Sequence, residues 1–293
     1  MTTIEILVAA RWVHFAALFA LFGCPLAFLL TCGAHAARVF HATDRLLHVV
    51  AITAAISGFV WIAALIANIV GGFGEAATPG ALKAFFFATR FGPIVIIRLV
   101  LLAAAVLAIV LPLRIRFMAW LLIAAGLLID QAWLGHAANG GANLSGAMMI
   151  AAYGAHVLAG AAWVGGLPVL LFSLRARAAP ADTVTVLSRY STLATAAVVF
   201  ILLSGLANTW FRLAGHIGRL AATDYGAILI TKLLLVALML ALASYNRFIA
   251  LPRLGAHSRA MPARLAASIS AELALGIIVI GAAALLGVTP PPN

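Results

Sequence analysis

The sequence has very few charged residues for its length. Of its 293 residues only 9% are charged, 66% are hydrophobic, and the mean hydropathy is +1.18. A soluble domain of this size needs a larger polar surface to stay in water, whereas a chain in lipid carries apolar side chains outside as well as inside. The composition therefore excludes a soluble globular protein and predicts an all-α integral membrane protein.

Acidic residues are scarcer still, with seven Asp and Glu against 18 Lys and Arg, which gives a formal net charge of +11. Arginines in short loops are what membrane orientation requires, so this charge does not indicate nucleic-acid binding. No Walker-type phosphate loop and no soluble segment large enough for a nucleotide is found, so nothing in the sequence supports an ATP-driven pump. The two cysteines, Cys24 and Cys32, form no CxxC pattern and are expected to be packing residues. We expect no enzymatic activity.

Eight apolar runs are each long enough to cross about 30 Å of hydrocarbon. They lie near 6–31, 46–71, 92–113, 117–136, 145–173, 190–211, 225–251 and 265–287. The first run has no small-residue cleavage site and is expected to be a retained helix. The link 72–91 is expected to hold a short interfacial helix with Phe85, Phe86 and Phe87 in the headgroup region. The chain is thus expected to be one membrane domain, 1–293, with helices one to four in 1–136 and five to eight in 137–293.

The distribution of Lys and Arg predicts the orientation, because positively charged short loops stay in the cytoplasm. One set of loops carries most of these residues: Arg38, Arg45, Arg114, Arg116, Arg175, Arg177, Arg189, Arg253, Arg259 and Arg264. We expect this set to be cytoplasmic and both termini to lie outside, which in a bacterial inner membrane means the periplasm.

The two halves of the chain share short motifs in the same order. "HFAALFALFGCP" from His14 aligns with "HVLAGAAWVGGLP" from His156, with a glycine nine residues after each histidine. "SGFVW" matches "SGLANTW", and "GPIVIIRLVLL" matches "GAILITKLLLV", where Arg98 and Lys232 each come six residues after the glycine. These matches predict two parallel four-helix repeats related by a pseudo-two-fold axis along the membrane normal.

His14 and His156 are the first candidate functional residues, because an ionisable side chain within the hydrocarbon is costly and suggests function. The alternative for each is a neutral histidine that hydrogen-bonds across a helix contact. His136 ends the fourth run on the same outer side, and Met148 and Met149 begin the fifth. Imidazole and thioether together suit copper, since thioether selects Cu(I) and imidazole binds either Cu(I) or Cu(II). The alternative for the methionines is gap filling between helices.

The remaining buried polar residues are candidates for an ion pathway or for charge balance. Glu272 is expected either to couple proton movement or to pair with Arg98 or Lys232. Asp130 is a second possible partner for the same cations, and Trp133 lies one helical turn from His136.

Several segments resemble the CopD family of copper resistance membrane proteins. They are "WLGHA" at 133–137, "HVLAGAAWVGGL" at 156–167, "SGLANTW" at 204–210, "DYGAILITKLLLVALMLALASYNR" at 224–247 and "AELALGIIVIGAAALLG" at 271–287. The resemblance implies an eight-helix inner-membrane protein that takes copper from the periplasm into the cytoplasm with a separate periplasmic CopC-like donor. It makes His136 and His156 the family-like histidines, accompanied by His14.

Two other functions remain open from the sequence. In a membrane b-type cytochrome, His14 and His156 would ligate haem between helices. In a non-transporting assembly subunit, the protein would bind copper outside without moving it.

Overall fold

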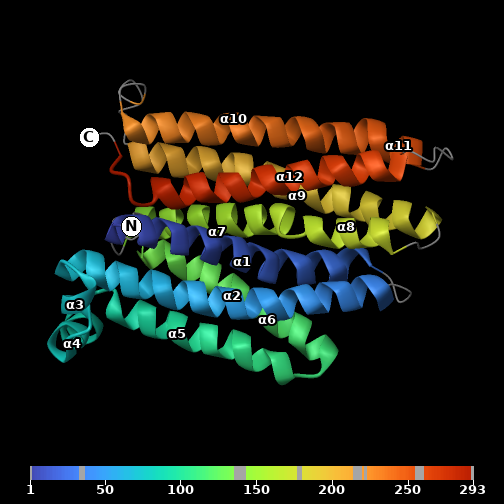
Figure 1. Ribbon diagram of the computed structural model, residues 1–293. Helices are drawn as coiled ribbons and strands as arrows, with labels where there is room; N and C mark the ends of the chain where they lie inside the picture. Colours follow the sequence, from blue (N-terminus) through green and yellow to red (C-terminus); the bar gives the residue numbers. More distant parts are fainter. Residues whose placement is uncertain are drawn as a thin grey trace.

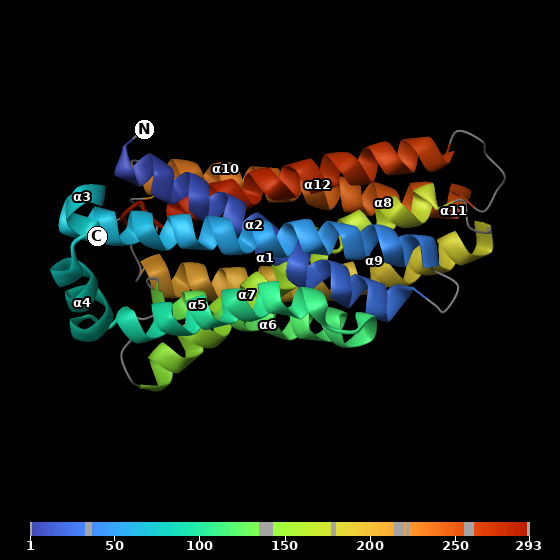
Figure 2. The same ribbon diagram turned by 60° about the horizontal axis from the view of Figure 1, so that its bottom comes forward.

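Long stretches rich in alanine and leucine form helices here, because a backbone in lipid must satisfy its polar groups within its own segment. The computed structural model describes residues 2–32, 37–134, 143–176, 180–213, 220, 223–254 and 261–291, and within them every regular element is helical. Eight helical segments are long and apolar enough to cross a membrane, as the sequence predicts. They run side by side along one common direction (Figures 1 and 2). The protein is therefore a multi-pass helical membrane protein.

The elements follow one another along the chain with short connections. They are α1 (Thr3–Thr31), α2 (Ala37–Val70), α3 (Phe73–Ala76), α4 (Pro79–Ala88), α5 (Gly92–Leu107), η1 (Ala108–Val110), α6 (Leu113–Leu134), α7 (Leu144–Val164), α8 (Leu167–Arg175), α9 (Pro180–Leu213), α10 (Asp224–Tyr245), η4 (Asn246–Ala250), α11 (Leu251–Leu254) and α12 (Met261–Leu286). α7 and α8 together make one crossing, as do α10, η4 and α11. Both termini lie at the same end of the bundle (Figure 1), as an even number of crossings requires.

Two helices extend well beyond the apolar runs that predicted them. α2 begins at Ala37 instead of near residue 46, and α9 begins at Pro180 instead of near residue 190. An apolar run marks only the part of a helix that faces hydrocarbon, and a helix continues through polar residues once its backbone ladder is established. Arg45 and Arg189, predicted in loops, are therefore on helices.

The predicted helix within 72–91 is confirmed. α4 begins after Thr78, whose side chain accepts a hydrogen bond from the backbone N–H of Ala81, and Pro79 occupies the first turn. Phe85 is buried at 2% exposure, whereas Phe87 is 81% exposed. This short helix therefore has one face against the bundle and one face turned outward.

The first and second halves of the chain meet where α1 lies against α7 and α8. At Gly23 and Gly165 the two backbones approach so closely that a Cβ on either residue would overlap main-chain atoms of the other helix. The thiol of Cys24 donates a hydrogen bond to the Gly165 carbonyl at 3.0 Å, which makes Cys24 a packing residue as expected. α10 lies at the edge of the bundle and packs mainly on α12 (Figure 1).

Candidate metal-binding site

His14 on α1 is fully buried and both of its ring nitrogens are engaged. Nδ1 lies 2.9 Å from the carbonyl oxygen of Ala54 on α2, and Nε2 lies 2.9 Å from Nη1 of Arg98 on α5. Because a guanidinium only donates, Nε2 accepts and Nδ1 must carry the ring proton. The ring also stacks on Trp61 with centroids 5.7 Å apart. Neither nitrogen of His14 is available to a metal in this arrangement.

Arg98 is held by a network of acceptors on α6. It forms an ion pair with Asp130, and it donates to the carbonyl of Leu127 at 2.8 Å and to Oε1 of Gln131 at 3.2 Å. The guanidinium carbon lies 4.7 Å from the centre of the Trp61 ring. Asp130, and not Glu272, therefore supplies the carboxylate partner of Arg98.

His156 on α7 makes contacts of the same kind with α9 but is only half-buried. Its Nδ1 lies 3.2 Å from the Ile201 carbonyl and 3.1 Å from Oγ of Ser204, whose own hydroxyl donates to the Phe200 carbonyl. Nδ1 therefore carries the proton and donates. Nε2 has no hydrogen-bond partner among the described residues, so its lone pair is free, which is the arrangement of a neutral metal-ligating imidazole.

Lys232 on α10 is close enough to His156 to interact with it electrostatically. Among the described residues it has no ion pair and no hydrogen bond, in contrast to Arg98. Within the described residues, the second half therefore contains a histidine with one free ring nitrogen and a lysine without a hydrogen bond or ion pair.

Met148 and Met149, the other predicted ligands that the structure describes, lie near the start of α7. Met148 is 52% exposed and Met149 is half-buried, and Trp133 at the end of α6 is 40% exposed. His136 lies outside the described residues. Within the described part of the chain, no three His, Cys, Asp or Glu side chains come together in a group that could hold a metal ion.

The structure does not bring His14 and His156 into contact with each other. The ring of His14 lies against α2 and α5, and the ring of His156 lies against α9. A haem ligated by both would need one free nitrogen from each, and Arg98 occupies Nε2 of His14. The haem alternative gains no support from this geometry.

Glu272 on α12 lies apart from both histidines. Its Oε1 accepts from the indole N–H of Trp163 at 2.6 Å, and its Oε2 accepts from the amide of Asn246 at 3.0 Å. No lysine or arginine of the described chain lies within ion-pair distance of it.

Sequence reasoning missed several residues that fix these side chains. Gln131 follows Asp130 directly, and Ser204 belongs to a repeated Ser-Gly motif, so both carried a signal in the sequence. Trp163 and Asn246 carried none, because their pairing with Glu272 depends on helix packing between residues far apart in the chain.

Comparison with known proteins gives two family models that match most of the chain. The model described as "Copper resistance protein D-like, N-terminal domain" matches residues 1–147, and the model described as "Copper resistance protein D" matches residues 184–286. No solved structure matches the chain.

Two curated proteins are similar to it. "Copper resistance protein D" of Pseudomonas syringae pv. tomato is 32% identical over 219 residues, which cover 69% of each chain. "Copper transport protein CutJ" of Bacillus subtilis is 30% identical over 236 residues, which cover 77% of this chain but only 42% of that protein. The N-terminal model alone spans half of the chain, and the Pseudomonas syringae protein is 32% identical over 69% of each chain. The chain therefore belongs to the copper resistance protein D family.

Proposed function

We propose that the protein binds copper from the periplasm at a site that includes His156 and moves it across the inner membrane into the cytoplasm. The observation that carries the proposal is the half-buried ring of His156, whose Nδ1 is fixed by Ile201 and Ser204 while Nε2 points to no partner among the described residues. A histidine ligand needs one ring nitrogen held by a hydrogen bond and the other nitrogen free to bind the metal. Names of relatives that refer to copper resistance and copper transport support copper as the cargo.

The charge distribution and the shared position of the termini support the proposed orientation. The bundle end opposite the termini carries most of the basic residues, among them Arg38, Arg116, Arg175, Arg253 and Arg264. This excess supports a cytoplasmic location for that end and a periplasmic location for both termini.

The proposed two-fold repeat gains support from matched contacts. His14 and His156 each lie against the glycine of a Ser-Gly pair, Gly58 and Gly205 respectively. Gly23 and Gly165, which the sequence aligns with each other, meet at the α1–α7 contact. A pseudo-two-fold axis through this contact accounts for both observations.

Copper would reach His156 from the periplasmic end of α7. Met149 precedes His156 by seven residues, or about two helical turns, so the two share a face of α7. Met148 and His136 are the further candidate ligands nearer the outer surface, and Trp133 is at the same end. A separate CopC-like periplasmic protein is the proposed donor. A few soft or neutral ligands suit this task, because a carrier must release what it captures.

The test is copper binding and uptake by the purified full chain in lipid vesicles. His156→Gln should abolish uptake, and His41→Gln, at an exposed histidine near the start of α2, should leave uptake unchanged. Uptake by His156→Gln at the rate of the unchanged chain would refute the assignment. Binding without uptake, with and without a periplasmic donor, would instead identify a non-transporting copper-binding subunit.

A further inference from the structure

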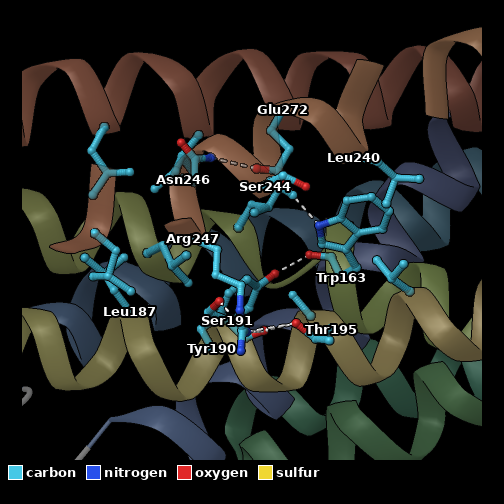
Figure 3. Close-up of a pocket in the computed structure, with 18 of the residues that line it drawn as sticks. Trp163, Leu187, Tyr190, Ser191, Thr195, Leu240, Ser244, Asn246, Arg247 and Glu272 are labelled. Carbon is cyan, nitrogen blue, oxygen red and sulfur yellow. Dashed lines mark hydrogen bonds between the residues drawn. The ribbon is translucent and has the colours of Figure 1, made fainter. Parts of the chain in front are cut away.

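A cavity of about 240 Å³ lies between α8, α9, η4 and α12 (Figure 3). It is in the half of the bundle nearer α11, the end proposed to be cytoplasmic. Its walls are mostly apolar, and its polar lining includes Ser191, Thr195, Asn246, Arg247 and Glu272. None of the candidate copper ligands lines it, so the cavity is separate from the copper site.

Glu272 is the carboxyl group of this cavity and is only 3% exposed. Its two oxygens accept from neutral donors, the indole of Trp163 and the amide of Asn246 (Figure 3). A carboxylate buried in a membrane protein without a cation is costly, and its retention suggests a function in ion or proton movement.

The hydrogen bonds around Glu272 can be kept whether or not the carboxyl carries a proton. The Trp163 N–H donates to a carboxyl oxygen in both forms. Asn246 donates to the ionised form through Nδ2, and its Oδ1 is buried with no hydrogen-bond partner among the described residues. A half-turn of the amide brings Oδ1 to accept from a protonated Oε2. The site can therefore gain and lose a proton without losing either contact.

A metal cation fits this site poorly. Hard cations require several oxygen ligands, and here both oxygens of Glu272 already accept N–H groups. The guanidinium of Arg247 lines the same cavity, where it donates to the Ser191 carbonyl, the Ser191 hydroxyl and the Thr195 hydroxyl at 2.8–2.9 Å. A fixed positive charge disfavours entry of metal ions, whereas a proton can be relayed through hydroxyl groups and water.

The surrounding elements supply few other charged or titratable groups. Among the described residues that line the cavity, the others are Arg247 on η4 and Tyr190 on α9, whose hydroxyl donates to the Trp163 carbonyl. Cys24 on α1 donates to the Gly165 carbonyl and does not line the cavity. Asn246 begins a π-helical segment, and such segments are frequent at functional sites because they aim side chains that a regular helix would not. Asn246 and Trp163 therefore orient Glu272, and Tyr190 and Arg247 line the cavity beside it.

We propose that Glu272 is a proton-binding site which the protein loads and unloads through this cavity, and that proton movement through it is coupled to copper movement. The proton binds to a carboxylate oxygen and leaves to water in the cavity. The coupling rests on the proposed copper function, whereas the proton site itself does not.

The proton site is tested by labelling the purified full chain with dicyclohexylcarbodiimide and mapping the product by mass spectrometry. A protonated carboxyl transfers its proton to a carbodiimide nitrogen while its oxygen bonds to the central carbon, and the adduct rearranges to a stable acylurea. Glu272 should be labelled, and the rate should fall about tenfold per pH unit once the carboxyl ionises. Asp130, which is paired with Arg98, is the internal control and should not react. Absence of labelling at Glu272, or a rate independent of pH, would overturn the proposal.

The coupling is tested in vesicles that contain a pH-sensitive dye, by adding copper to the unchanged chain and to Glu272→Gln. Glutamine keeps an acceptor for Trp163 and a group that bonds Asn246, so the variant should fold and bind copper normally. Copper-driven proton movement should be lost in Glu272→Gln, and its persistence at the original rate would overturn the coupling. If the unchanged chain moves no copper, the proposed function fails, while the labelling result stands independently.

Discussion

His14 and His156 have the same kind of contact at Nδ1 but differ in what lies at Nε2. Each ring donates from Nδ1 to a carbonyl of the next long helix, Ala54 or Ile201, and each lies against a glycine. In the first half Arg98 then occupies Nε2 of the histidine, whereas in the second half Lys232 leaves Nε2 open. An arginine has five N–H donors in one rigid plane, whereas a lysine has one ammonium group on a flexible stem. Arg98 can therefore hold several neighbouring acceptors in fixed positions at once, which a lysine does less well. Positions that the sequence aligns thus hold a hydrogen-bonded histidine and arginine in the first half, and a histidine and lysine without a hydrogen bond between them in the second.

The largest effect is expected when Arg98, which bonds both His14 and Asp130, is removed. Arg98→Ala leaves Asp130 buried without its partner, and loss of one member of a buried ion pair costs about 3–5 kcal/mol. The thermal unfolding midpoint of the detergent-purified protein should fall steeply. The matched control is the double variant Arg98→Met with Asp130→Leu, which leaves no unpaired charge and should recover most of the loss. An unchanged midpoint in Arg98→Ala would contradict the structural role.

The second test compares the glycines behind the two histidines. A Cβ at Gly58 would lie 2.8 Å from Cε1 of His14 and 2.7 Å from Cδ1 of Leu102, but a Cβ at Gly205 would lie 3.2 Å from Cε1 of His156. Since His14 cannot move away from Arg98, Gly58→Ala should cost about 1–3 kcal/mol of stability. Gly205→Ala should cost clearly less, because the contact with the His156 ring is longer and only the Nδ1 side of that ring is hydrogen-bonded. Equal losses in the two variants would show that the second site is as rigid as the first.

The third test concerns the residue that orients His156. Ser204→Ala removes one of two acceptors for Nδ1, and loss of such a partner should lower copper affinity about tenfold. Competition with a chelator in lipid nanodiscs measures this affinity. Ser57→Ala is the matched control, since the Ser57 hydroxyl donates to the backbone carbonyls of Thr53 and Ala54 on its own helix and not to the His14 ring. Identical affinities for both variants would argue against His156 as a ligand.

The smallest expected effect is at the methionines. Met149→Leu should weaken copper binding by a few-fold, because Met149 lies on the same face of α7 as His156 two turns away. Met148→Leu should have the lesser effect, since Met148 is rotated away and more exposed. A larger loss in Met148→Leu than in Met149→Leu would shift the site outward along α7.

Much of the fold was predictable because lipid imposes a simple length rule. All eight crossings and the short helix between 72 and 91 follow from apolar runs and turn residues. The early starts of α2 and α9 were not predictable, since polar residues end the apolar signal without ending the helix. Hydropathy reports where lipid begins and not where a helix begins.

The candidate site was predictable as a set of residue types but not as a set of contacts. His14 and Arg98 stand out as polar residues in apolar runs, but nothing in the sequence says that one occupies the other's Nε2. Glu272 stood out for the same reason, whereas its partners Trp163 and Asn246 did not. Contacts between residues on different helices depend on how those helices rotate against each other, and the helical period alone does not fix that rotation.

The contact between Gly23 and Gly165 has a mechanical consequence. With backbones touching and the Cys24 thiol bonded across the contact, separating α1 from α7 would open a gap that no side chain can fill. If the two halves of the proposed carrier moved apart at this contact, they would lose this close packing and the Cys24 hydrogen bond. Any movement that accompanies the proposed transport would then take place at other helix contacts, with α1 and α7 kept together.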